Sequence, residues 1–141
     1  GRIPVLHLSL PEVAERFQKR GFFRIKVNLT ATVRVVDQEG KIDAPKRVPI
    51  VDMSGSGLAF AWPKSVPLHL NAALAINDIP GIGTTEVMTR VMRCTRVERE
   101  DDAPIYHIGV QFQGISRGMR DRIIRYLFHV QRAQVERVKD E

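Results

Sequence analysis

The sequence predicts a mainly-β fold, a six-stranded antiparallel β-barrel that is followed by one C-terminal α-helix. Three observations lead to this fold class. Apolar and polar residues alternate through several short segments, turn-forming residues separate those segments, and after residue 115 the apolar residues recur every three or four positions instead. The chain has 141 residues, of which 43% are hydrophobic and 27% charged, as expected for one globular domain. Short antiparallel strands closed by a terminal helix are typical of a small barrel.

The chain begins with a segment that we expect to be an arm rather than part of the barrel. Pro4 and Pro11 disfavour a long helix in residues 1–15, which we interpret as an extended linker from a preceding N-terminal domain. Because the first residue is Gly1 and not Met, we interpret the chain as a piece of a longer protein. The barrel domain is expected to occupy residues 16–115.

The first strand is predicted at residues 22–36, where β-branched and other apolar residues alternate with polar ones. A half-buried strand needs this period of two because its successive side chains point to opposite faces. Segments rich in Gly, Pro, Asp and Ser then separate the apolar runs and indicate turns. The remaining strands are expected at residues 48–51, 58–62, 71–77, 84–99 and 105–112.

A C-terminal helix is predicted for residues 116–141, with the helical pattern running to about Val138. Ser116 is a suitable N-cap because its side-chain oxygen can accept a hydrogen bond from a free backbone N–H of the first turn. One face of the helix is apolar and contains Met119, Ile123, Leu127 and Val130. We expect this face to cover the barrel, the alternative being contact with a partner chain.

The charge of the chain is concentrated at its two ends. Lys and Arg number 22 and Asp and Glu 16, and the balance is +5 over residues 1–47, −2 over 48–115 and +3 over 116–141. Such a field favours a partner that carries phosphate groups. A basic surface that serves only solubility is the alternative interpretation.

The sequence offers no support for catalysis or for a bound metal. Four His residues are scattered without the paired spacing of metal ligands, and no Walker loop, nucleophile elbow or His-Glu-x-x-His motif occurs. Cys94 alone can form neither an internal disulfide nor a cysteine zinc cluster, so we expect a reducing, cytoplasmic location. No apolar run of 18 residues is present to cross a membrane. We therefore expect no enzyme, no metal, no cofactor and no membrane span.

Two short motifs stand out against this background. The first is Arg20-Gly21-Phe22-Phe23-Arg24, which places two arginines four residues apart at the start of the first predicted strand. The second is Asp52-x-Ser54-x-x-Gly57, which lies between two predicted strands. The arginine motif alone is weak, because a chain with 22 basic residues gives such spacings easily, whereas chance gives the second pattern in only about a few per cent of chains of this length. Together they contain groups for both a phosphate and a purine base.

The two motifs together have the chemistry to bind a guanine nucleotide. An arginine fork suits a phosphate or the O6 and N7 atoms of guanine, while the Asp52 carboxylate can accept the N1–H and N2–H₂ donors of guanine. Ser54 can bond a phosphate or the base, and Gly57 allows close approach of the backbone. Gly55 and Ser56 can add backbone N–H groups to an anion nest. The alternative is that this segment is only a tight connection between two strands.

In their order and spacing, Arg20-x-x-x-Arg24 and Asp52-x-Ser54-x-x-Gly57 resemble the PilZ domain, a bacterial receptor for the second messenger cyclic di-GMP. The resemblance covers about residues 16–115 and implies a six-stranded barrel, with Ile108-Gly109-Val110-Gln111-Phe112 as the closing strand. The flanking segments resemble those of flagellar brake proteins, in which another barrel precedes the PilZ domain.

The resemblance implies that cyclic di-GMP is bound by Arg20, Arg24, Asp52, Ser54 and Gly57. The two arginines would bind guanine and phosphate, the aspartate and serine would hold the other guanine and its ribose-phosphate, and the glycine would make room. Lys19 would add a further cation. Ligand binding would order the arginine segment and thereby regulate motility through a flagellar motor or stator protein, without any specific nucleic acid.

Two other functions are compatible with the residues alone. A small barrel with basic ends could bind nucleic acid with little sequence preference, although no row of aromatic side chains is evident for base stacking. The domain could also be an accessory unit of a larger complex that retains only a vestigial pocket. Steep salt dependence and acceptance of many oligonucleotides would indicate the first of these alternatives.

Overall fold

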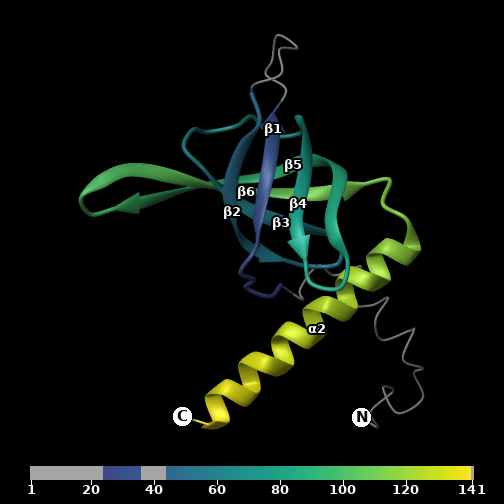
Figure 1. Ribbon diagram of the computed structural model, residues 1–141. Helices are drawn as coiled ribbons and strands as arrows, with labels where there is room; N and C mark the ends of the chain where they lie inside the picture. The colour runs from purple at the N-terminus through teal and green to yellow at the C-terminus, as the bar shows by residue number, and fades with distance from the viewer. Residues whose placement is uncertain (1–23, 36–43, 141) are drawn as a thin grey trace, which may run out of the picture.

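The computed structural model describes residues 24–35 and 44–140, and their strands form a closed antiparallel barrel (Figure 1). Around the barrel the strand order is β1-β2-β3-β6-β5-β4, which confirms the predicted six-stranded fold. The predictions for Lys19, Arg20 and the N-terminal arm lie outside the described residues. The strands are β1 (Thr30–Val35), β2 (Lys46–Met53), β3 (Gly57–Trp62), β4 (Asn71–Ile79), β5 (Gly83–Arg99) and β6 (Asp102–Gln113).

The predicted first strand is shorter than expected, because β1 begins only at Thr30. The residues before it still run beside β2, where Ile25 and Met53 form an isolated bridge with two backbone hydrogen bonds of 2.9 Å. At the same point of β2, a register shift between Ile50 and Asp52 marks an irregularity in its pairing with β3 on the other side. The alternation of apolar and polar residues nevertheless places apolar side chains in the core as predicted, since Ile25, Ala31 and Val33 are all buried.

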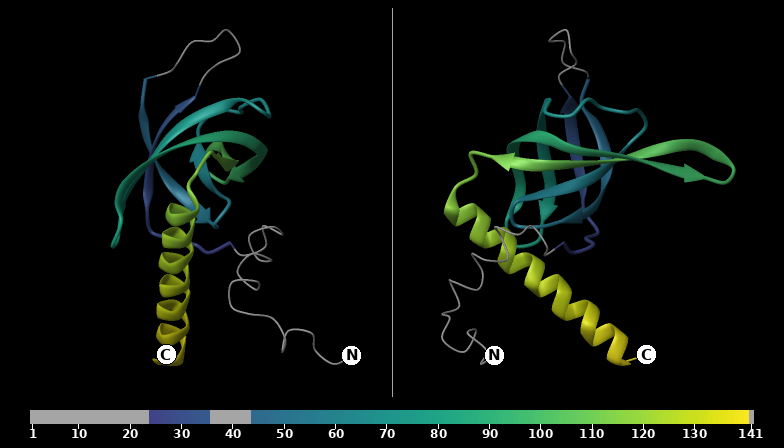
Figure 2. Two further views of the ribbon diagram at one scale, coloured as in Figure 1. Left: turned by 90° about the vertical axis from the view of Figure 1, so that its right-hand side faces the viewer. Right: turned by 180° about the vertical axis from the view of Figure 1, so that it is seen from behind.

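Strands β5 and β6 form a hairpin that extends beyond the barrel wall (Figures 1 and 2). The loop expected at residues 100–104 is therefore reduced, since Arg99 pairs with Asp102 and only two residues lie between them. Likewise, β2 exceeds its predicted limits at both ends. Lys46 and Arg47 pair with β1 at one end, and Asp52 and Met53 pair with β3 at the other. Sequence patterns locate these strands correctly but underestimate how far cross-strand hydrogen bonds continue.

The barrel is filled by apolar side chains from every strand, with Met53, Leu58, Phe60 and Ile108 fully buried among them. Ala59 on β3 and its partner Gly109 on β6 lie between core residues of their strands, so both positions face outward.

The C-terminal helix α2 (Arg117–Asp140) packs its first half against one end of the barrel and then continues away from it (Figure 2). Ile123 and Leu127 are 0% and 1% exposed and belong to the core, which confirms that this face covers the barrel. Ser116 caps the helix as predicted, because its Oγ accepts a hydrogen bond of 3.1 Å from the backbone N–H of Met119. Within the described residues, no helix is long and apolar enough to cross a membrane.

Candidate functional site

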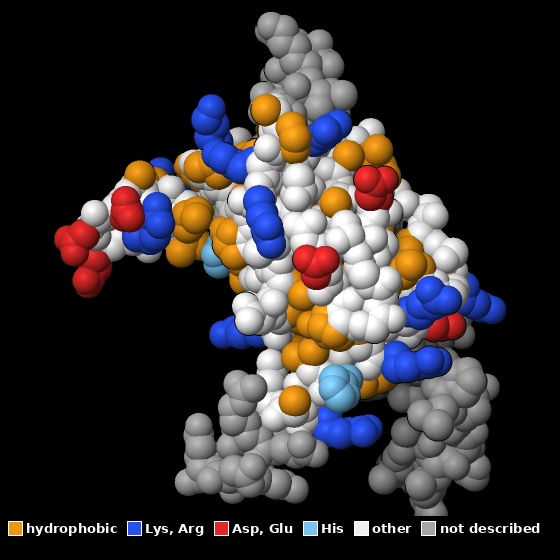
Figure 3. Space-filling view, viewed as in Figure 1, with side chains coloured by type: hydrophobic (Ala, Val, Ile, Leu, Met, Phe, Trp, Pro, Cys, Tyr) orange, Lys and Arg blue, Asp and Glu red, His pale blue; other side chains and the backbone are white. Residues whose placement is uncertain are grey.

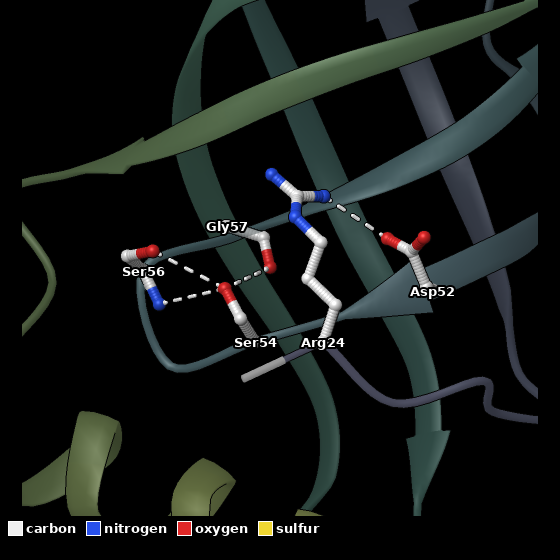
Figure 4. A network of polar contacts seen from close by, with 5 residues as sticks. All are labelled: Arg24, Asp52, Ser54, Ser56 and Gly57. Carbon is white, nitrogen blue, oxygen red and sulfur yellow. Dashed lines mark hydrogen bonds and ion pairs between the residues drawn. The ribbon is translucent and has the colours of Figure 1, made fainter. Parts of the chain in front are cut away.

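The fold brings the described arginine of the first motif to the acidic residue of the second. Arg24 Nη1 lies 3.0 Å from Asp52 Oδ1, although the two residues are 28 positions apart in the sequence (Figure 4). The bridge between Ile25 and Met53 explains this arrangement. Both bridge residues turn their side chains into the core, so Arg24 and Asp52, each next to one of them, face outward.

The Arg24–Asp52 ion pair remains accessible to a ligand. The side chains are 34% and 25% exposed, so each group is held in position without being sealed from solvent. In this geometry the guanidinium already neutralises the carboxylate. A ligand that offers both an anion and hydrogen-bond donors can take over both partners of the pair.

Ser54 closes the turn between β2 and β3. Its backbone N–H donates to the Gly57 carbonyl at 2.8 Å, and its Oγ accepts from the Ser56 N–H at 3.2 Å. The Ser54 hydroxyl also donates to the Gly57 carbonyl at 3.3 Å and is 3.1 Å from the Ser56 hydroxyl (Figure 4). The residue is only 3% exposed. The segment is thus a tight strand connection, as one interpretation of the sequence held, and it also borders the Arg24–Asp52 pair.

Gly57 is required by the barrel itself. A Cβ atom there would overlap the carbonyl oxygen of Val110, and it would lie 3.1 Å from the Val110 carbonyl carbon and 3.2 Å from Gln111 Cα. These are backbone atoms of β6, which pairs with β3 at this point. The motif predicts that this glycine makes room for a ligand, and the structure provides a separate reason for it within the fold. The predicted contact of Gly57 with a ligand stays a prediction.

A cleft of about 310 Å³ lies on the outer wall beside these residues. It is lined by Arg24, Ser56, Gly57, Met92, Arg93, Gly109, Val110 and Gln111. Residues from β5 and β6 therefore line the candidate site as well, and no sequence motif indicates them. The two motifs lie in the segment before β1 and in the β2–β3 turn, so they carry no information on the opposite wall.

Arg93 is the one charged residue that β5 and β6 contribute to the lining of the cleft, and no sequence motif indicates it. A register shift between Val91 and Arg93 marks a β-bulge in β5, and Met92 and Arg93 are both exposed. Simple alternation would have turned one of these two side chains into the core. The only signal in the sequence is the series of arginines along β5, which does not identify the member that faces the cleft.

The charge near the cleft is positive, because Arg24 and Arg93 border it with Asp52 beside them. Acidic side chains instead gather at the far tip of the β5–β6 hairpin (Figure 3). Among the residues that the structure describes, no group of three or more His, Cys, Asp or Glu side chains is placed to hold a metal ion. A phosphate-bearing organic ligand fits this distribution of charge.

Comparison with known sequences gives the family. The sequence model of the PilZ domain matches residues 18–129, which is most of the chain. The chain belongs to the PilZ domain family. The matched region includes both motifs, the whole barrel and the first half of α2.

Two curated relatives have names from motility. The chain is 29% identical over 135 residues to flagellar brake protein YcgR 2 of Dechloromonas aromatica, covering 92% of this chain and 53% of that protein. It is 26% identical over 135 residues to flagellar brake protein YcgR of an Azoarcus species, covering 92% and 52% respectively. This PilZ chain therefore spans about half the length of the curated relatives that it matches.

Solved structures support the fold. The PilZ domain of YcgR from Escherichia coli, determined with c-di-GMP, matches with a TM-score of 0.64 at 13% identity, covering 88% of this chain and all of that one. The Bacillus subtilis inhibitor of motility matches with a TM-score of 0.59 at 17% identity, covering 81% and 51%. At these identities the likeness establishes a shared fold.

Proposed function

We propose that this PilZ domain is a receptor for cyclic di-GMP and that the ligand binds on the outer wall of the barrel, at the Arg24–Asp52 pair. The observation that carries the proposal is the contact of Arg24 from the first motif with Asp52 from the second on one accessible patch, with 3.0 Å between guanidinium and carboxylate. The PilZ domain of Escherichia coli YcgR, which has the same fold, was determined with c-di-GMP, and the curated relatives are flagellar brake proteins. Family membership favours this function over tolerant binding of nucleic acid.

In the proposed complex the ligand replaces an ion pair. The Asp52 carboxylate accepts the N1–H and N2–H₂ groups of a guanine, and Arg24 turns to a phosphate or to a base. Breaking the existing pair costs less than about 1 kcal/mol, because it is partly exposed to water. The stronger charge-assisted hydrogen bonds to the ligand then offset this cost.

The other predicted ligand residues complete this proposal. Ser54 acts mainly by holding the turn, with Ser56 and the backbone N–H groups around Gly55 near the ligand phosphates. Arg20 and Lys19 supply further cations from the segment before Ile25. By tying that segment to the barrel, the ligand reorients the preceding domain, whose linker we assign to residues 1–15.

We assign this domain a regulatory role rather than catalysis. In the longer protein, the reoriented segments present a surface to a flagellar motor or stator protein, and motility is reduced. The cytoplasmic location expected from the sequence is part of the same proposal. We also propose that the domain consists of a barrel at residues 16–115 and a helix at residues 116–141, and that the helix covers one end of the barrel without moving on ligand binding.

The test is a calorimetric titration of the chain with cyclic di-GMP and with its adenine analogue. We expect binding of the guanine compound only, because adenine lacks the donors that Asp52 accepts. Arg24→Ala and Asp52→Ala should each weaken binding by roughly 10- to 100-fold, the range for hydrogen bonds to charged groups. Arg34 is exposed on β1 and does not line the cleft, so Arg34→Ala removes the same charge and should leave the affinity unchanged.

Three results would count against the proposal. Equal binding of both cyclic dinucleotides would contradict the role of Asp52, and unchanged affinity in Arg24→Ala would exclude its guanidinium from the site. Tight binding of unrelated oligonucleotides that falls steeply with salt would restore the nucleic-acid alternative.

A further inference from the structure

The outer wall of the barrel has a row of residues that leads from Asp52 to Arg93. Asp52 on β2 pairs with Ala59 on β3, Ala59 pairs with Gly109 on β6, and Gly109 pairs with Arg93 on β5. Neighbouring strands lie about 4.8 Å apart, so the backbones at the two ends of the row are separated by about 14 Å. The two middle residues are the smallest available, and they leave a shallow floor between an acidic and a basic end.

The Arg93 side chain lies along this floor rather than extending into solvent. A Cβ atom at Gly109 would be 3.3 Å from Arg93 Cβ, 3.3 Å from Nε and 3.4 Å from Nη2. The chain from Cβ to the guanidinium therefore folds over the glycine, toward β3 and the cleft that Arg24 also lines. A larger residue at position 109 would force it outward.

Arg93 also differs from the other arginines farther along β5. Arg96 Nε is 2.7 Å from Glu98 Oε1, and Arg99 Nε donates to the Ala103 carbonyl at 2.8 Å. Among the described residues, the guanidinium of Arg93 has no side-chain hydrogen bond and no ion pair. A guanidinium that is positioned over the wall, exposed and unpaired is available to a ligand.

We infer that Arg93 is a further ligand-binding residue, and that its guanidinium stacks on one purine base of the cyclic dinucleotide. The inference rests on the proposed function and extends it to β5. The lower face of the side chain rests on Gly109, which leaves the opposite face open to the cleft. Planar guanidinium groups stack on bases, and a ligand with two purines can occupy both ends of the row, one at Asp52 and one at Arg93.

The test compares three variants by calorimetry with cyclic di-GMP, with thermal unfolding as a check on the fold. Arg93→Ala should weaken binding by roughly 10-fold, as for the loss of one stacking contact. Arg93→Lys should be equally weak, because an ammonium group keeps the charge but has no planar face. Arg96→Ala removes the same charge from the same strand and should bind as the unsubstituted chain does.

Gly109→Ala provides an independent test, because it leaves Arg93 in place and changes only the floor beneath it. The added methyl group displaces the side chain by a few tenths of an ångström, so binding should weaken several-fold. In a background that already carries Arg93→Ala, the same substitution should have no further effect on affinity.

The outcomes separate this inference from the proposed function. If Arg24→Ala weakens binding but Arg93→Ala does not, Arg93 lies outside the site and the inference is wrong. Restored affinity in Arg93→Lys would show a contact of point charges and would overturn stacking. If the unsubstituted chain does not bind cyclic di-GMP at all, the proposed function fails, and the inference fails with it.

Discussion

Substitution of Gly57 by alanine tests whether this motif residue serves the fold or the ligand. The added Cβ would overlap the Val110 carbonyl oxygen and would press on the Val110 carbonyl carbon and Gln111 Cα, at 3.1 and 3.2 Å. All three are backbone atoms, so no side-chain rotation can relieve the contact, and β3 and β6 must separate locally. Overpacking in a core typically costs 1–3 kcal/mol. We expect a loss near the upper end, about 3 kcal/mol in the free energy of unfolding.

Urea unfolding and thermal melting measure this effect directly. A loss of about 3 kcal/mol should lower the melting temperature by about 10 °C for a domain of this size. Gly118→Ala is the matched control, because no heavy atom lies within 4 Å of a Cβ built at that helical glycine. The same change of residue should there raise stability by about 0.5 kcal/mol, through the better helix propensity of alanine.

The result that would refute this reasoning is an unfolding free energy of Gly57→Ala equal to that of the unsubstituted chain. If such a stable variant also failed to bind cyclic di-GMP, the glycine would be needed for ligand approach alone. A destabilised Gly57→Ala variant supports the structural role. The affinity for cyclic di-GMP that this variant retains then shows how strongly binding at the β2–β3 turn depends on the spacing of β3 and β6.

Three further substitutions test the scaffold around the site. Ser54→Ala should cost about 1–2 kcal/mol in urea unfolding, because the buried hydroxyl bonds the backbone of the turn, and an unchanged midpoint would contradict that. Ile123→Ala should lower the free energy of unfolding by about 2–5 kcal/mol, because it leaves a cavity between α2 and the barrel. The neighbouring Ile124 is only half-buried, so Ile124→Ala should lower it clearly less. Burial raises the pKa of the Tyr126 phenol, so stability should be unaffected below about pH 10 and fall above it as the phenol ionises. Tyr126→Phe should reduce that alkaline loss, as measured by melting temperature against pH, and an identical profile would exclude Tyr126 as its source.

Hydrophobic periodicity was sufficient to predict the barrel and its helix. The alternation through Ile25, Ala31 and Val33 places side chains in the core as expected, and Ile123 and Leu127 pack as the helical pattern requires. These predictions succeed because burial of apolar surface depends on periods that a sequence displays directly. Where each strand ends depends on cross-strand hydrogen bonds, which a single segment does not specify.

The site was predictable on one side only. Asp52 and Arg24 belong to recognisable motifs, and the structure brings them into contact. The opposite wall depends on a β-bulge at Met92, which turns Arg93 to the outer face, and on the register that aligns it with Gly109. Both are properties of pairing between distant strands. No pattern within β5 distinguishes Arg93 from the arginines on either side of it.

The position of the site limits how a ligand can produce a signal. The barrel is closed, and core residues such as Met53 and Phe60 are fully buried, so ligand contacts on the outer wall have little means of deforming it. Arg24, in contrast, directly precedes Ile25, which joins β2 by a single bridge. A ligand held by both Arg24 and Asp52 adds links between the barrel and the chain where that pairing begins. The signal is therefore expected to pass through the segment before Ile25, and variants that weaken the bridge should uncouple ligand binding from regulation while leaving the barrel intact.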